Sequence, residues 1–61
     1  MIIKLTMKCG DIIRFESGRD FDKISEDILN QQWRRVKDLE GIKVVFNIDN
    51  LKYISHEQTN K

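Results

Sequence analysis

Every second residue is apolar near both ends of this chain, and this alternation limits the folds open to it. Ile3, Leu5 and Met7 follow the pattern at the N-terminal end, and residues 42 to 48 repeat it near the C-terminal end. A period of two is typical of a strand that buries one face and exposes the other. Both ends of the chain are therefore predicted to contribute strands to a sheet.

Residues 2 to 16 are predicted to form a β-hairpin that turns at Gly10. Two residues that stand directly opposite each other in a hairpin have their side chains on the same face of the sheet. Leu5 and Ile13 therefore share a face only if the residue numbers of each opposed pair add up to an even number. A two-residue loop of Cys9 and Gly10 gives an odd sum. We therefore expect a loop of three residues or a bulge, with Gly10 in the left-handed conformation.

Asp20 is predicted to be the N-cap of a helix that follows the hairpin. Its apolar residues have helical spacing: Phe21, Ile24, Ile28 and Leu29. Its early turns carry three acidic residues, whose negative charges interact favourably with the positive N-terminal end of the helix dipole: Asp22, Glu26 and Asp27.

Residues 33 to 40 fit two structures. In one, the helix continues to about 20 residues, because the apolar residues of this segment stay on its apolar face. In the other, residues 33–37 form a strand that pairs with residues 42–46 and places Trp33 opposite Phe46. A helix of about 11 residues matches the length of the strands better, which favours the second structure slightly.

The sequence predicts the α+β class. A turn at residues 47–50 precedes a final short strand at residues 51–55, and residues 56–61 carry no apolar side chain and are expected to form a flexible tail. The predicted order is ββαββ or ββαβββ, with one helix packed on one face of a small, mainly antiparallel sheet. Residues 1–55 are expected to form a single domain.

Length, charge and cysteine content narrow the classes of function. A chain of 61 residues has room for one modest core and little room for a deep substrate cleft. Eleven basic residues against ten acidic ones give a net charge of +1, too little for a global attraction to nucleic acid or membranes. Cys9 is the one cysteine, which favours the cytoplasm, and neither a leader nor a membrane-spanning segment is expected.

The sequence offers no arrangement of residues that predicts catalysis. It lacks metal-ligand spacing, a nucleophile beside a base, and a glycine-rich phosphate loop. A pair of Cys9 with His56 would require the tail to fold back across the sheet. We therefore expect a protein that is not an enzyme and has no cofactor, metal or small-molecule substrate.

Two sets of residues are candidates for binding a macromolecule. The first is a partner-binding set of residue types common in protein interfaces, joined by the acidic residues of the helix: Trp33, Arg34, Arg35, Tyr53, Asp22, Glu26 and Asp27. The second is the alternative, a basic set that would hold nucleic acid if it converged on one face of a dimer: Lys4, Lys8, Arg34, Arg35 and Lys37.

A homodimer is a further expectation. Ile2, Ile12 and Val45 are predicted to point away from the face that the helix covers. Small sheets with open edges and a modest core often gain stability by pairing with a copy or a partner. An interaction module is therefore the predicted type of protein.

Most of the chain resembles many tiny proteins encoded by phages and prophages of low-GC Gram-positive bacteria, in its residue usage and in its succession of strands and turns. The residues that carry the resemblance are the opening Met1–Thr6 segment, the Gly10–Asp11 turn, the acidic helix, Trp33 and the closing Phe46–Ile54 segment. The resemblance implies a protein that binds one host or phage protein and inhibits or redirects it. The predicted function is a non-catalytic protein-binding module, an inhibitor or regulator of a host protein, with weak nucleic-acid binding through residues 33–37 as the alternative.

Overall fold

The computed structural model describes residues 1–57, and its elements follow the order ββαβββ. They are β1 (Ile2–Met7), β2 (Ile12–Glu16), α1 (Phe21–Leu29), β3 (Trp33–Lys37), β4 (Lys43–Asn47), a 3₁₀ turn η1 (Ile48–Asn50) and β5 (Leu51–Glu57). The α+β class is confirmed. The expectation of one sheet is wrong, because the strands form two antiparallel sheets, β2-β1-β5 and β3-β4.

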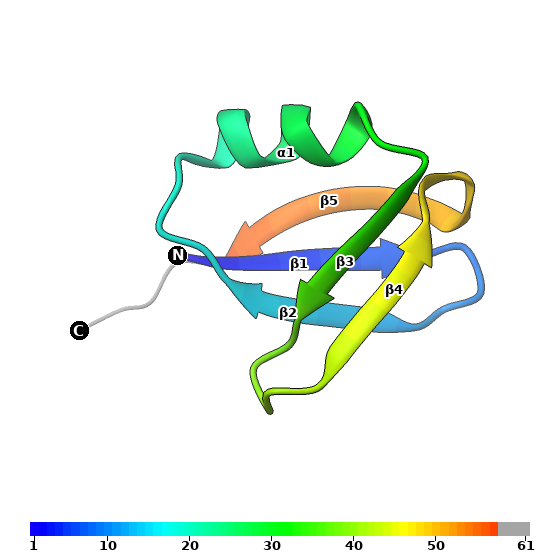
Figure 1. Cartoon of the computed structure of the whole chain (residues 1–61), viewed down its shortest axis with the longest axis horizontal. Coiled ribbons are helices and arrows are strands. Elements are labelled where there is room, and N and C mark those ends of the chain that lie inside the picture. The colour runs from blue at the N-terminus through cyan, green and yellow to red at the C-terminus, as the bar shows by residue number, and fades with distance from the viewer. Residues whose placement is uncertain (58–61) are drawn as a thin grey trace.

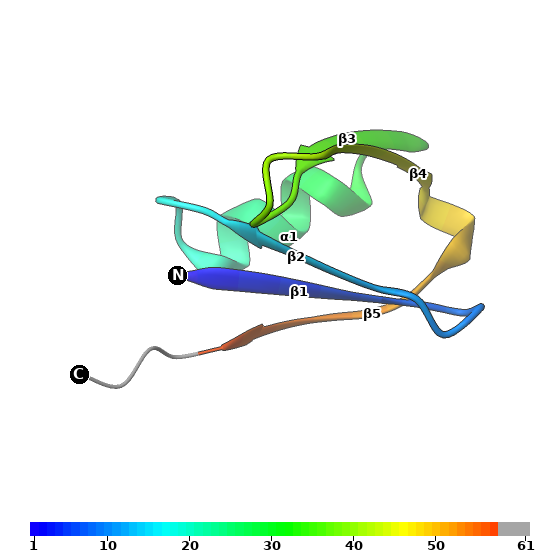
Figure 2. The same cartoon turned by 90° about the horizontal axis from the view of Figure 1, so that it is seen from below.

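The two sheets and the helix enclose one apolar core. In Figure 2 the β3–β4 hairpin forms one layer and β1, β2 and β5 form the other, while Figure 1 shows the hairpin crossing β1 and β2 obliquely with α1 alongside. The buried side chains come from both sheets and from the helix: Ile3, Leu5, Met7, Phe15, Ile24, Ile28, Val36 and Phe46. Each element thus buries one face against the other two.

The first hairpin confirms the parity argument. Leu5 opposes Ile13, so the opposed positions have an even sum and the apolar residues of β1 and β2 share one face. The Met7 N–H donates to the Asp11 carbonyl at 2.8 Å, which closes a three-residue loop. Gly10 ends that loop with φ of +99°, the left-handed conformation that was predicted.

The second hairpin repeats the geometry of the first. The Asp38 N–H donates to the Ile42 carbonyl at 2.9 Å, and Gly41 ends the loop with φ of +86°. The Gly41 N–H donates to the Asp38 carbonyl at 3.0 Å, as the Gly10 N–H does to Met7. Residues 10–15 and 41–46 have similar sequences, and each segment begins with the glycine that ends its loop.

This second hairpin decides between the two structures open to residues 33–40. They form a strand and a turn, and the helix is short, nine residues in length. The predicted pair of Trp33 with Phe46 is wrong, because Phe46 opposes Arg34 and Trp33 opposes Asn47. Because this loop also has three residues, the residue numbers of opposed pairs again add up to an even number. Phe46 and Trp33 therefore lie on opposite faces of the hairpin, with Phe46 in the core and Trp33 on the outside.

The helix begins where the sequence predicted. Asp20 occupies the N-cap position, but its side chain makes no capping hydrogen bond, and its carbonyl accepts the Ile24 N–H at 3.0 Å. Ile24 and Ile28 are buried, whereas Leu29 at the last turn is 60% exposed. Within residues 1–57, no helix has the length and apolar character needed to span a membrane.

β5 is longer than predicted, so the expected boundary at Ser55 lies two residues too early. His56 opposes Ile3 on β1, and its ring lies 4.7 Å from the ring of Phe21. Glu57 opposes Ile2. Backbone pairing with β1 needs no apolar side chains, which explains why composition missed this extension. Residues 58–61 of the expected tail lie outside the described residues.

Candidate functional site

The outer surface of the β3–β4 hairpin carries exposed apolar and basic side chains. We call this surface the hairpin face and define it by Trp33, Arg35, Lys37, Lys43 and Val45. Its residues occupy the outward positions of the two strands, since Arg35 opposes Val45 and Lys37 opposes Lys43. Trp33 is 61% exposed and Val45 is 54% exposed. Large apolar side chains that remain this exposed suit a contact with another molecule.

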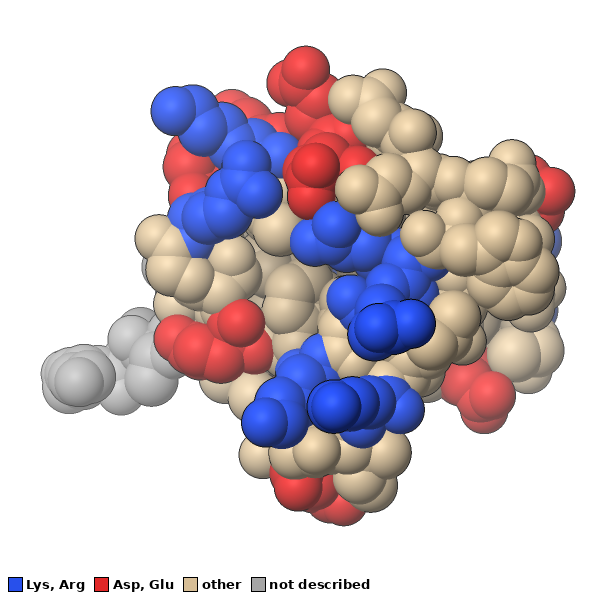
Figure 3. Space-filling view, viewed as in Figure 1, with Lys and Arg blue, Asp and Glu red and all other residues tan. Residues whose placement is uncertain are grey.

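The hairpin face is positively charged. Figure 3 shows Lys and Arg side chains gathered in front of β3 and β4. Arg35, Lys37 and Lys43 form no ion pair with any residue between 1 and 57. Their charges therefore remain available to an acidic ligand, with Arg35 beside the exposed Val45 and with Lys37 and Lys43 at the end of the face opposite Trp33.

Arg34 has a different role from its neighbours, because it points to the inner side of the hairpin. Its guanidinium lies 2.9 Å from an Asp27 carboxylate oxygen and donates to the Gln31 side-chain oxygen at 3.3 Å. The Arg34 side chain is only 20% exposed, and its Nε is buried without a hydrogen-bond partner in residues 1–57. Arg34 and Asp27 thus connect the hairpin to α1.

The structure divides the predicted partner-binding set among separate surfaces. Trp33 and Arg35 lie on the hairpin face. Tyr53 opposes Thr6, which places it on the outer surface of the other sheet. Asp22 and Glu26 are exposed on α1. Neighbouring strand residues point in opposite directions, so a run such as 33–35 does not present all its side chains to one partner.

The predicted nucleic-acid set is divided in the same way. Lys4 lies on β1, opposite Arg14 of β2 and away from the hairpin face. Lys8 is exposed in the first turn. Arg34 points inward, which leaves Arg35 and Lys37 together on one surface. Lys43 joins them there and was absent from the predicted set.

Two residues of the hairpin face, Lys43 and Val45, were missed as site residues. They can be identified by the argument already used for the first hairpin, that alternate residues of a strand point to opposite faces and that opposed residues share a face. When Val36, Val44 and Phe46 are assigned to the buried face, Lys43 and Val45 fall on the same outward face as Arg35.

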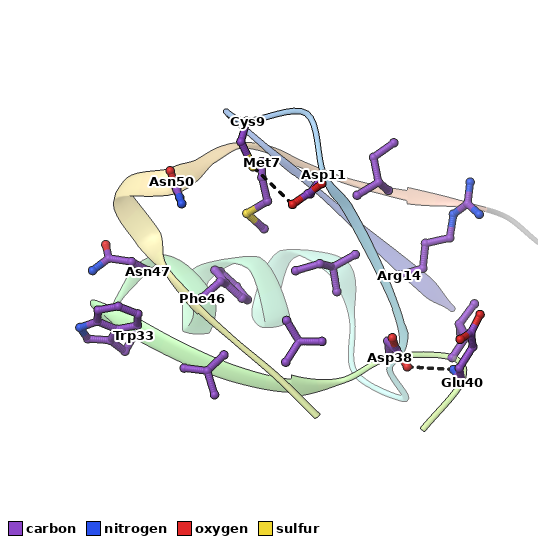
Figure 4. A pocket seen from close by; sticks show the side chains of 15 residues that line it. Met7, Cys9, Asp11, Arg14, Trp33, Asp38, Glu40, Phe46, Asn47 and Asn50 are labelled. Atoms are coloured by element: carbon purple, nitrogen blue, oxygen red, sulfur yellow. Dashed lines mark hydrogen bonds between the residues drawn. The ribbon is translucent and has the colours of Figure 1, made fainter. Parts of the chain in front are cut away.

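A groove of about 760 Å³ lies beside the hairpin face, between β4 and β2. Apolar side chains form much of its lining: Met7, Ile12, Ile13, Leu39, Val44, Val45 and Phe46. Trp33 and Asn47 lie near one end, and Arg14, Asp38 and Glu40 lie near the other (Figure 4). Its volume falls within the range of about 300–1,000 Å³ typical of ligand sites.

The described residues offer no metal centre and no nucleophile beside a base. Among residues 1–57, no group of three or more His, Cys, Asp or Glu side chains is placed to hold a metal ion. The Cys9 thiol donates to an Asp11 carboxylate at 3.5 Å. His56 opposes Ile3 near the far end of β1, so the thiol and the imidazole are separated by most of that strand.

No family model, curated protein or solved structure matches this chain. The resemblance to phage-encoded proteins therefore stays a prediction, as does the homodimer. Of the outward apolar residues, Ile12 lies on β2 and Val45 on β4, and both line the groove between these strands.

Proposed function

We propose that the protein is a non-catalytic binding module whose hairpin face docks on an acidic surface of a protein partner. The observation that carries this proposal is the position of exposed Trp33 and Val45 beside three cations that form no ion pair within residues 1–57. Trp and Arg are the residue types most often responsible for binding energy in interfaces. Cations beside the apolar side chains add selectivity for an acidic partner and speed association.

The size of the molecule supports a contact that extends beyond the hairpin face. A standard interface buries about 800 Å² on each partner. The described chain exposes 4506 Å² in all, so an interface of that size occupies close to a fifth of its surface. The groove beside β4 is the adjoining surface best able to contribute the remaining area.

The class of partner comes from the resemblance to phage-encoded proteins. On that basis we propose an inhibitor or regulator of a bacterial host protein, acting in the cytoplasm. The exposed free thiol of Cys9 suits a reducing compartment.

A matched pair of charge-reversal variants tests the proposal. Tagged wild-type protein is incubated with nuclease-treated lysate of a low-GC Gram-positive bacterium and washed at high salt. We expect one stoichiometric protein to bind the wild type and the control Lys8→Glu/Lys52→Glu, which changes two exposed lysines elsewhere. Arg35→Glu/Lys37→Glu should lose that protein, because it reverses two charges of the hairpin face. If both variants retain it equally, the hairpin face is not the docking surface.

Binding of single-stranded nucleic acid is a second candidate, favoured by the exposed ring of Trp33 beside the cations of the hairpin face. A base stacked on an aromatic ring contributes about 1–3 kcal/mol. Three neutralised phosphates would give a logarithmic salt slope of roughly −2. Affinity for an oligo-dT probe should then fall as salt rises from about 50 to 200 mM. An affinity that does not change with salt would reject this candidate.

A further inference from the structure

The outer edge of β4 carries backbone groups that no other strand within residues 1–57 uses. The Ile48 N–H donates to the Gln32 carbonyl at 2.7 Å, and the Asp38 N–H donates to Ile42, so the even-numbered residues of β3 and β4 exchange the hydrogen bonds of the hairpin. The amides and carbonyls of Lys43 and Val45 and the amide of Asn47 therefore point outward, while the Asn47 carbonyl belongs to η1, of which Asn47 is the N-cap. No hydrogen bond among residues 1–57 occupies them.

The edge of β2 faces the same groove from the other side. The Ser17 N–H donates to Met1 and the Met7 N–H donates to Asp11, which shows that the odd-numbered residues of β2 pair with β1. The backbone of Ile12 and Arg14 thus points away from β1. The Leu39 N–H donates to the Arg14 carbonyl at 3.1 Å, and this contact closes one end of the groove.

We propose that the groove accepts an extended segment of the protein partner, which adds to the edge of β4 as a further strand. This inference rests on the proposed function and assigns the type of segment that the partner supplies. Strand addition at an open edge gives affinity through the backbone and selectivity through alternate side chains. The five residues of β4 offer an edge of about 17 Å.

The lining of the groove specifies the side chains of the added strand. Its inward side chains would face Ile13, Val44 and Phe46, so apolar residues fit there. Its outward side chains would extend the hairpin face beside Lys43 and Val45, where acidic residues are complementary to the cations of that face. The charged side chains that line the groove itself are three acids and one base, so acidic residues fit only these outward positions: Asp11, Asp38, Glu40 and Arg14. The expected segment therefore alternates apolar and acidic residues.

The charge of the hairpin face argues against a second copy of this chain as the occupant. Edge-to-edge pairing of two β4 strands would join two hairpin faces into one surface that carries Arg35, Lys37 and Lys43 of both copies, with Lys43 on the pairing strand itself. Like charges side by side disfavour such pairing, and lysines on an edge strand are a common protection against it. An acidic segment meets the same cations with the opposite sign.

Amide exchange measured by NMR tests the proposal with a defined probe. The probe is a capped synthetic heptapeptide in which Glu and Val alternate, and the control peptide has the same composition with its Val residues in one block. We expect the alternating peptide to slow exchange of the Val45 and Asn47 amides by about tenfold or more. The Arg35 and Lys37 amides on the opposite edge of the hairpin should keep their rates.

Other outcomes overturn the proposal in distinguishable ways. If the fluorescence of Trp33 responds to the peptide and exchange at Val45 does not, the ligand lies on the hairpin face without adding a strand, and the proposed function survives. Equal binding of the block peptide, or no binding of either, also rejects strand addition, while the charge-reversal experiment decides the proposed function separately. If the Val45 amide becomes more protected from exchange as the protein concentration rises without peptide, the edge of β4 pairs with a second copy of the chain.

Discussion

Gly10 and Gly41 occupy the same position in the two hairpins of this protein. Each is the last residue of a three-residue loop and has a positive φ, +99° and +86° respectively. A Cβ built at either position meets no atom within 4 Å. The requirement for glycine is therefore conformational, since other L-residues rarely adopt this backbone geometry.

Substitution of these glycines tests that interpretation. Gly10→Ala and Gly41→Ala should each lower the free energy of unfolding by about 1–2 kcal/mol. Gly18→Ala is the matched control, because Gly18 lacks a positive φ and its Cβ would also meet nothing within 4 Å. Urea unfolding should show Gly18→Ala to be neutral or more stable by up to about 1 kcal/mol. Equal destabilisation by all three substitutions would contradict the conformational explanation.

Asp27 on α1 and Arg34 on β3 join two elements that share few other polar contacts. Arg34 is the more buried partner, and its Nε already lacks a hydrogen-bond partner within residues 1–57. Asp27 has a second cation nearby, Arg19, at 3.7 Å. The two partners are therefore not equivalent: loss of Asp27 leaves a half-buried positive charge, whereas loss of Arg34 leaves a carboxylate near solvent and Arg19.

Single substitutions should reveal this asymmetry. Asp27→Ala should lower the free energy of unfolding by about 1–3 kcal/mol, because the guanidinium of Arg34 is left without its carboxylate. Arg34→Met keeps an apolar stem of similar length and removes the charge, so it should cost less. Urea unfolding of both variants gives the comparison. Both variants remove the ion pair, so a larger loss for Arg34→Met would contradict the asymmetry and show that the unpaired Asp27 carboxylate costs more than the stranded Arg34 guanidinium.

The whole molecule depends on a small core shared by two sheets and one helix. Ile28 lies at the centre of that core with no exposed area, while its neighbour Leu29 is mostly exposed. A domain of 61 residues is expected to have a total stability of about 3–9 kcal/mol. Removal of one large buried side chain is therefore comparable with the entire stability.

Two neighbouring substitutions on α1 test this dependence. Ile28→Ala should cost about 2–5 kcal/mol and leave much of the protein unfolded. Leu29→Ala, which removes an exposed side chain from the same helix turn, should change stability by less than about 0.5 kcal/mol. Thermal unfolding followed by circular dichroism distinguishes them. Similar midpoints for the two variants would show that the helix does not stabilise the core.

Across the whole molecule, the residues of the candidate site were predicted only in part from the sequence. Trp33, Arg35 and Lys37 were named from residue type, and the structure places them on one face. Arg34 was grouped with them because it is adjacent in sequence, yet strand geometry turns it toward α1. The separation of Tyr53 from Trp33 depended on which sheet each strand joins, and residue type carries no information on that point.

The sequence by itself left residues 33–40 open between helix and strand, but it determined much of the local structure elsewhere: the alternation that forms the first hairpin and β4, the glycine that ends the first loop, and the position where α1 begins. These features depend on residues close together in the chain, so their physical causes can be read from composition and spacing. Only the tertiary structure decided that the strands form two sheets and that β2 and β4 leave a groove between them. Backbone hydrogen bonds between strands are the same for every sequence, and the choice of strand partners therefore depends on how the helix and both sheets pack around one core.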